Sequence, residues 1–373
     1  MKKSREIGKT AGAGTFEKGL TVLETIERAP HPLTLQEIAA ESGIQRLAVY
    51  RLASVLEQRG YVRRGPDKRY RAVSRRRRLL LGYAGPHSGN TFRVDLASSL
   101  QRAAAAHEAD LISLDNRPDD IKELMRSADT MIEARVDVAM FFQPVEALGH
   151  MMADRLSAAG LPFITIERPI QGGIYFGANN YLAGKLAGLR LGEHALEHWR
   201  GRFDAVVLIE GAHTSTNVNA RLAGVLVGLR DVSGSVEESK IVHLHGNADR
   251  EASRAAMLEL LRRLPRRSRL LVSGFNDISA LGALDAVMSE GREAGVAIVG
   301  HNAMQESRVE IRKPASPFIA SVAYFPERYG EKLLRIATAL SAGDAVPPAG
   351  YTDHLVIDRN NVNALYPREA GGE

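Results

Sequence analysis

Apolar residues in the first 74 positions recur at helical spacing in short segments. Residues 16–28 and 45–58 each carry apolar side chains three or four positions apart, which predicts two amphipathic helices. Between them, Thr34 and Glu37 have the spacing of a capping box, so a further helix should begin at Thr34. Two strand-like runs follow, separated by a turn rich in Gly and Pro. The pattern predicts three helices and a hairpin over residues 15–74.

The pattern changes after residue 78, where strand-length apolar runs alternate with helical segments. This alternation is typical of parallel, doubly wound sheets with helices on both faces, so we predict an α/β fold. Residues 79–367 exceed what one hydrophobic core usually holds, and we therefore expect two lobes. We assign residues 79–177 and 325–345 to the first lobe, and 178–324 and 350–367 to the second. The strand-like runs are 79–83, 110–114, 136–142, 162–166, 205–209, 240–244, 269–273, 297–299 and 318–322.

Composition excludes several classes of protein. Hydrophobic residues make up 45% of the 373 positions and charged residues 25%, as in ordinary globular proteins. The chain has no cysteine, which excludes disulfides, cysteine nucleophiles and cysteine-based metal sites. No run approaches the roughly 20 apolar residues that a membrane-spanning helix needs, and no apolar stretch follows the basic N-terminus. We expect a soluble, cytoplasmic protein.

The charge of the chain is unevenly distributed. Residues 1–78 hold 18 Lys and Arg against 8 Asp and Glu, whereas the remaining residues hold 31 against 36. Part of the excess lies in the four arginines at 75–78, which we interpret as a linker, and residues 1–14 should form a disordered tail. A basic head on a mildly acidic body is typical of a protein whose small domain binds a polyanion.

Four segments of the head resemble the winged helix–turn–helix of IclR-type regulators: FEKGLTVL (16–23), LTLQEIA (33–39), GIQRLAVYRL (43–52) and LEQRGYV (56–62). The resemblance implies a recognition helix in the DNA major groove and a hairpin on the DNA backbone. Gln and Arg can hydrogen-bond to base edges, while basic hairpin residues suit phosphates. The alternative is a helical domain with a solvated basic face. The predicted DNA-binding residues are Thr34, Gln45, Arg46, Ala48, Val49, Tyr50, Arg51, Arg64, Lys68 and Arg69.

Six segments of the body resemble the fold shared by LacI-type repressors and periplasmic sugar-binding proteins: PFITIER (162–168), GANNYLAGKLA (177–187), NVNARLAGV (217–225), SGFNDISALGAL (273–284), VGHNA (299–303) and SVAYFPERYG (321–330). The resemblance implies a sugar site between the lobes, with Arg168 and Arg221 as bidentate donors and Phe92 stacked on the sugar ring. Asn302 stands where this family usually has Asp, which removes a charge. The predicted effector-binding residues are Phe92, Glu167, Arg168, Asn217, Arg221, Asn276, Asn302 and Tyr324.

Other motifs carry less weight. His194 and His198 match the H-x-x-E-H pattern of zinc peptidases, but the surrounding leucines indicate an outer helix, and no third ligand is evident. The segment from Gly177 to Lys185 has six residues between its glycines instead of the four of a phosphate loop. We therefore predict no metal, no cofactor and no catalytic residue.

The leading hypothesis is a transcription regulator, expected to be a repressor, that binds double-stranded operator DNA and senses a sugar or sugar derivative. We expect a homodimer, with a tetramer as the alternative, because paired heads reading a near-palindrome gain affinity and register. The alternatives are a sugar-metabolising enzyme tethered to the helix–turn–helix, such as a sugar kinase, and a transport-type binding protein.

Overall fold

The computed structural model describes residues 13–72, 78–117, 119–211 and 216–367. The chain divides into two compact units, Met1–Arg77 and Arg78–Glu373, which we call the head and the body and describe separately. Nearly all of the predicted tail at 1–14 and of the arginine linker at 75–78 lies outside the described residues. Within the described ranges, no helix is both long enough and apolar enough to cross a bilayer.

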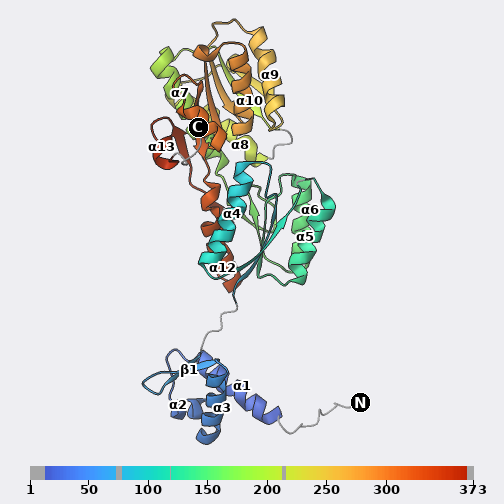
Figure 1. Cartoon of the computed structure of the whole chain (residues 1–373), viewed down its shortest axis with the longest axis vertical. Helices are drawn as coiled ribbons and strands as arrows, with labels where there is room; N and C mark the ends of the chain where they lie inside the picture. Colours follow the sequence, from blue (N-terminus) through green and yellow to red (C-terminus); the bar gives the residue numbers. More distant parts are fainter. Residues whose placement is uncertain (1–12, 73–77, 118, 212–215, 368–373) are drawn as a thin grey trace. The chain divides into compact units, whose positions relative to one another are not determined.

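The head contains three helices and a two-stranded hairpin (Figure 1). Its elements are α1 (Ala13–Arg28), α2 (Leu35–Ser42), α3 (Arg46–Gln58), β1 (Val62–Arg64) and β2 (Tyr70–Ala72). Thr34 caps α2, since its hydroxyl accepts from the Glu37 N–H while the Glu37 carboxylate accepts from the Thr34 N–H. Gly43 then ends the helix in the left-handed region, at φ 70°. Leu33 pairs with Tyr70 through two backbone hydrogen bonds, which fasten the hairpin to the helices.

The first lobe of the body is a six-stranded parallel sheet with the order β13-β7-β6-β5-β3-β4. Figure 1 shows α4 and α12 on one face of this sheet and α5 and α6 on the other. The strands are β3 (Leu80–Gly85), β4 (Asp110–Asp115), β5 (Val138–Phe141), β6 (Phe163–Ile166), β7 (Ile174–Gly177) and β13 (Ala349–Tyr351), and the helices are α4 (Thr91–Ala106), α5 (Ile121–Glu133), α6 (Glu146–Ala158) and α12 (Tyr329–Ala342).

The second lobe has the strand order β14-β12-β11-β10-β8-β9, and only the pairing of β12 with β14 is antiparallel among the described strands of this sheet. The strands are β8 (Ala205–Glu210), β9 (Ile241–His245), β10 (Leu270–Gly274), β11 (Val296–Asn302), β12 (Phe318–Ala323) and β14 (Leu355–Asp358). The helices are α7 (Asn180–Trp199), α8 (Thr216–Ser233), α9 (Arg250–Arg263), α10 (Asp277–Ser289), α11 (Gln305–Arg312) and α13 (Val362–Leu365).

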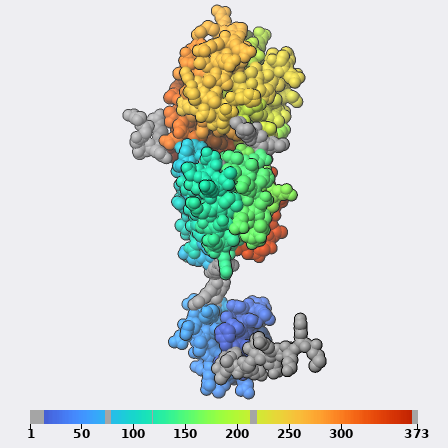
Figure 2. Space-filling view, turned by 90° about the vertical axis from the view of Figure 1, so that its right-hand side faces the viewer, coloured from blue at the N-terminus to red at the C-terminus, as the bar shows by residue number. Residues whose placement is uncertain are grey.

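The chain passes between the lobes three times. The first crossover is residues 178–179, between β7 and α7; the second is 324–328, between β12 and α12; the third is 352–354, between β13 and β14. The third crossover corrects the predicted boundary, because β13 at 349–351 pairs with β7 of the first lobe and does not begin the second. In the space-filling view the lobes form two masses, and the orange-red residues of α12 lie against the first (Figure 2).

One hydrophobic cluster continues through both lobes. It includes Leu81 and Phe176 of the first lobe, Val206 of the second, and the two tyrosines Tyr324 and Tyr329 near the second crossover. Two further clusters fill the opposite faces of the two sheets. Because the packed core runs through the hinge region, side chains at the crossovers are positioned by both lobes.

Candidate functional site

Parallel strands of both lobes end at the crossovers, and ligands of open α/β sheets bind outside such carboxyl ends. Glu167 directly follows β6 and adopts φ 63°, a left-handed conformation that is uncommon for a residue with a side chain. Asn302, Ala303 and Phe325 have positive φ as well, at the ends of β11 and β12. Backbone strain of this kind gathers at functional sites, so these strand ends are the candidate site.

Glu167 connects the end of β6 to the first crossover and to the first residue of α12. Its Oε1 atom accepts hydrogen bonds from the Tyr329 hydroxyl at 2.5 Å and from the Ala178 N–H at 3.2 Å. Burial raises the pKa of Glu167 above its usual range, while the Tyr329 hydroxyl and the charge of Arg221 act in the opposite direction. The Oε1 atom of the carboxyl group is therefore engaged by the hinge region.

Arg221 on α8 lies at the centre of a polar cluster, with a residue exposure of 5%. Its Nε and Nη2 atoms donate to Oδ1 of Asn180 at 3.0 and 2.6 Å, and Nη1 donates to the Phe275 carbonyl. The guanidinium carbon lies 5.0 Å from the Phe275 ring centroid and 5.2 Å from that of Tyr324. All of these partners are neutral, and together they fix the orientation of a buried cation.

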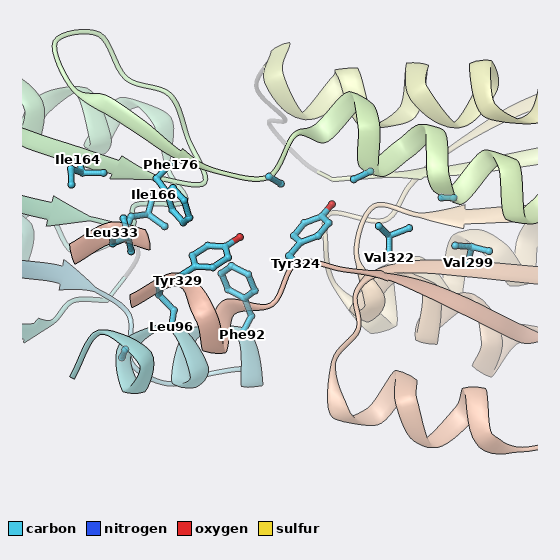
Figure 3. Packing of buried hydrophobic residues seen from close by; sticks show 14 of the residues in the cluster. Phe92, Leu96, Ile164, Ile166, Phe176, Val299, Val322, Tyr324, Tyr329 and Leu333 are labelled. Carbon is cyan, nitrogen blue, oxygen red and sulfur yellow. The ribbon is translucent and has the colours of Figure 1, made fainter. Parts of the chain in front are cut away.

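Tyr324 connects this cluster to the hinge. Its hydroxyl lies 3.4 Å from Nδ1 of the buried His301, and its backbone carbonyl accepts from the Thr352 hydroxyl at 2.7 Å. Figure 3 shows Tyr324 and Tyr329 where the two lobes meet, with the Tyr329 hydroxyl on the side of Tyr324 and the Tyr324 hydroxyl directed toward the second lobe. The aromatic ring of Tyr324 also meets His354 edge-on, with 4.9 Å between the ring centroids.

His354 joins all three crossovers. It belongs to the third, its Nε2 accepts from the Asn179 N–H of the first at 3.0 Å, and its Nδ1 lies 3.3 Å from the Ala323 carbonyl, where the second begins. This pattern requires the neutral imidazole with the proton on Nδ1. Burial, together with the charge of Arg221, lowers the pKa of His354 to about 4, so the ring is neutral at physiological pH.

Asp277 fixes the loop that follows β11 through hydrogen bonds. Its carboxylate accepts from the Met304 N–H, the Ser307 hydroxyl and the Ser321 hydroxyl, each at 2.6 Å. Asn302 therefore sits at a strained position, φ 103°, on a rigid support. The neighbouring Asn276 caps α10, because its Oδ1 accepts from the Ser279 N–H at 2.8 Å.

Phe92 and Asn302 come from different lobes and meet at one pocket. Phe92 lies in the first turn of α4 and is 8% exposed, with its ring edge-on to Phe142 and Tyr329 at 5.9 Å between centroids (Figure 3). Phe92 therefore packs as a core residue that also reaches the pocket. The pocket is lined by Thr91, Phe92, Asp95, Asn302, Ala303, Met304, Arg308, Pro326, Glu327 and Tyr366.

Two predicted effector residues stand apart from the central cluster. Arg168 follows Glu167, but its nearest charged partner is Glu146, at 3.9 Å. Its Nη1 atom is buried and has no hydrogen-bond partner among the described residues. Asn217 lies in the first turn of α8, and its side chain falls outside the described residues.

The head presents a polar face along α3. Gln45, Arg46, Tyr50 and Arg51 are exposed, and Ala48 is half-buried beside them. The prediction that Val49 contacts DNA is wrong. Its side chain is fully buried in the core of the head and points away from the exposed face of α3. Its role is to hold α3 in place.

The hairpin contributes fewer free cations than its sequence indicates. Arg64 and Lys68 are exposed. Arg69, in contrast, donates from Nη1 to the Pro32 carbonyl at 2.9 Å and to the Glu37 carboxylate at 3.0 Å. Its guanidinium thus fastens the hairpin to α2, and the Thr34 hydroxyl is likewise engaged as the α2 cap.

Sequence reasoning did not single out several residues of the central cluster. Four of them lie within segments that carry the family resemblance: Asn180, Phe275, His301 and Tyr329. The resemblance therefore pointed to the right segments of the chain but not to the roles of these residues. His354 lies outside every such segment, and only the fold reveals its position between the crossovers.

Comparison with known proteins agrees with this architecture. Residues 81–345 match the family model of the periplasmic binding protein domain, and residues 15–66 match the IclR helix–turn–helix domain. The predicted fold class, a winged helix–turn–helix followed by a two-lobed parallel-sheet domain, is confirmed.

Individual relatives fall into two groups. A D-ribose/D-allose-binding protein of Pseudomonas aeruginosa is 34% identical over 149 residues, which cover 38% of this chain and only 44% of that protein. A solute-binding protein of Mycobacterium smegmatis with bound glycerol superposes with a TM-score of 0.67 at 20% identity, over 78% of this chain and 98% of its own. A solute-binding protein of Actinobacillus succinogenes with bound D-allose superposes with a TM-score of 0.65 at 17% identity, over 76% of this chain and 99% of its own. At these identities the structural matches establish the fold.

Proposed function

Because the chain belongs to the periplasmic binding protein domain family and carries an IclR helix–turn–helix domain at residues 15–66, we propose that it is a DNA-binding transcription regulator controlled by a sugar or sugar derivative. The observation that carries the proposal is the presence of both domains in one chain: one with an exposed polar helix face, the other with a polar cluster at its interlobe crossovers. The proposal includes action in the cytoplasm, where operator DNA is found.

The body acts as the sensor. A ligand seated between the lobes touches strand ends of both, and Glu167 at the end of β6 accepts a hydrogen bond from the Ala178 N–H of the first crossover. Lobe closure thus changes the hinge, and in a dimer it changes how two heads are presented to DNA. Arg221, Asn276, Asn302 and Tyr324 from the second lobe, with Glu167 and Arg168 from the first, are the proposed ligand contacts. Asn217 and Phe92 complete the proposed set.

The relatives support a polyhydroxylated ligand. The matched relative from Pseudomonas aeruginosa is named for D-ribose and D-allose, and the superposed structures hold glycerol and D-allose. Sugar hydroxyls are both donors and acceptors, which suits the amides and guanidinium groups at these strand ends. Repression relieved by ligand remains the proposed direction of regulation.

The head supplies DNA affinity and sequence readout. Gln45, Arg46, Tyr50 and Arg51 on α3 are the proposed base and groove contacts, with Ala48 beside them and Arg64 and Lys68 on the backbone. A homodimer, or a tetramer built from it, would present two such heads to a near-palindromic site.

The enzyme alternative gains no support from the family matches, which describe a DNA-binding domain and a binding-protein domain. A transport-type binding protein has no use for the DNA-binding domain. Both alternatives make different predictions from the regulator: the enzyme converts its sugar, and the transport protein binds sugar without affinity for DNA.

The proposal is tested with the full chain and duplexes selected from a random pool. We expect operator affinity to fall steeply as the salt concentration rises. Replacing both Arg46 and Arg51 by Ala should lower operator affinity by about tenfold or more. A Leu196→Ala variant on the exposed face of α7 is the control that should leave DNA binding unchanged. Failure to select any duplex, or equal affinity in the double variant, would reject the regulator.

A further inference from the structure

We propose that the effector is an anionic sugar derivative, bearing a carboxylate or a phosphate, and that the Arg168 guanidinium binds the anionic group. This inference deepens the proposed function and rests on it. Four observations support it: the state of Arg168, the partners of Arg221, the engagement of Glu167, and the absence of a carboxylate at position 302.

Arg168 is a largely buried cation without a matched partner. Its side chain is 16% exposed, and Nη1 is enclosed without a hydrogen bond to any described residue. The carboxylate of Glu146 is 3.9 Å away, beyond hydrogen-bond distance, and its side chain is 51% exposed. Burial lowers the pKa of Arg168, the direction expected when a charge loses water without gaining a full counter-charge.

Arg168 also occupies the right place for a ligand contact. It comes directly after β6, at the carboxyl edge of the first sheet, and Glu146 begins α6 at the same edge. The planar guanidinium offers parallel donors that match a carboxylate or a phosphate in a bidentate pair. A neutral hydroxyl could accept a hydrogen bond from one N–H of the guanidinium, but it would not neutralise the positive charge of Arg168.

Arg221, the buried cation of the central cluster in the second lobe, is likewise surrounded by neutral groups. Arg221 donates to the Asn180 amide oxygen and the Phe275 carbonyl, and it lies over two aromatic rings. Glu167 interacts electrostatically with Arg221, but its Oε1 atom already accepts hydrogen bonds from the Tyr329 hydroxyl and the Ala178 N–H. That carboxyl group compensates one cation at most.

The second lobe adds no free negative charge at this point. Asn302, at the end of β11, carries no charge. Asp277, the acid behind the Asn302 loop, is fully buried and accepts three hydrogen bonds from Met304, Ser307 and Ser321. Asp95 and Glu327 line the pocket beside Phe92, where Arg308 accompanies them. The excess of positive charge thus lies at Arg168 after β6, and an anion is favoured there.

The first arm of the test uses matched ligands and the full-length protein. Isothermal titration compares D-ribose, D-ribonate and D-ribose 5-phosphate, and then D-glucose, D-gluconate and D-glucose 6-phosphate. We expect one anionic compound to bind about ten- to a hundredfold tighter than its neutral parent, as a charge-assisted pair replaces a neutral one. The carboxylate and phosphate members distinguish the two sources of charge.

Variants assign the effect to Arg168. Arg168→Gln should remove the preference for the anion, whereas Glu146→Gln, which removes the nearby carboxylate, should strengthen it. Asn302→Asp should shift the preference toward the neutral sugar. Equal or tighter binding of the neutral parents by the unmodified protein would overturn the inference while leaving the proposed function intact.

A second arm does not depend on the identity of the sugar. Sulfate, compared with chloride at equal ionic strength, should raise the melting temperature of the unmodified protein more than that of Arg168→Gln. Without added anion, Arg168→Gln should melt at the same or a higher temperature, because a buried unpaired cation is removed. An identical sulfate response in both proteins, or a clear loss of stability in Arg168→Gln, would overturn the inference. A chain that binds neither DNA nor any panel compound instead rejects the proposed function.

Discussion

Asn180 and Arg221 are joined by two hydrogen bonds, in which Nε and Nη2 of Arg221 donate to the same amide oxygen at 3.0 and 2.6 Å. Asn180 is the first residue of α7, directly after the first crossover, and Arg221 is on α8. The pair therefore links the proposed ligand contact to the point where the chain enters the second lobe. We therefore expect a movement of Arg221 to reach the hinge through Asn180.

Replacing Asn180 by Ala should destabilise the body, because the buried guanidinium loses its side-chain acceptor. We expect a loss of about 2–4 kcal/mol in the free energy of unfolding, measured by denaturant titration at pH 7. Leu182→Ala, at an exposed position of the same helix, should change it by less than about 0.5 kcal/mol. Equal stabilities of the two variants would show that the pair does not fix Arg221.

Asp277 should be sensitive to the loss of its oxygens. Asp277→Ala leaves the Met304 N–H and the Ser321 hydroxyl without this acceptor, while the Ser307 hydroxyl retains the Met304 carbonyl, so we expect a loss of about 2–4 kcal/mol. Asp277→Asn retains one acceptor oxygen and should lose less. Thermal unfolding of both variants checks the order, and an alanine variant as stable as the asparagine one would contradict it.

The contact between α7 and α8 depends on glycine. A Cβ atom at Gly188 would lie 2.0 Å from the Val225 carbonyl oxygen, and one at Gly228 would lie 2.0 Å from that of Lys185. Both atoms belong to backbone and cannot move aside, so Gly188→Ala should force the helices apart at a cost of about 1–3 kcal/mol or more. Leu196→Ala, exposed on α7, is the control for the melting temperature. A neutral Gly188→Ala variant would disprove the close packing.

Stability should fall in acid partly through His354. Its pKa is lowered from 6.5 to about 4, so the unfolded chain binds a proton over this range while the folded chain does not. The contribution is present above pH 6.5 and is lost as the pH falls toward 4, by about 3 kcal/mol. Arg221, Asp353 and Lys332 are the charged groups that act on the ring.

The check is the difference in pH dependence between the unmodified protein and His354→Gln. Other histidines titrate in both proteins and cancel in this difference. If the stabilities of the unmodified protein and His354→Gln changed in parallel between pH 4 and 6.5, His354 would not be the neutral, buried link between the crossovers.

The sequence predicted the order of elements well, because alternating apolar runs and capping signals are local. Thr34 and Glu37 form the predicted capping box, and the predicted lobes differ from the structure mainly at β13. Long-range pairing was not predictable: Arg69 resembled a phosphate ligand until the fold placed it against Glu37, 32 positions away. Val49 could face either core or groove on periodicity alone, since core and exposed positions are adjacent along α3.

The central claim is that a small ligand in the body controls DNA binding by the head. The most direct measurement is the dissociation constant of the full chain for a selected operator, by fluorescence anisotropy, with and without a saturating sugar derivative from the panel. We predict a change of at least about fivefold without consumption of the ligand. The change should be absent in Arg221→Ala, which should still bind DNA. Operator affinity that does not change at ligand saturation, or conversion of the sugar, would contradict the account.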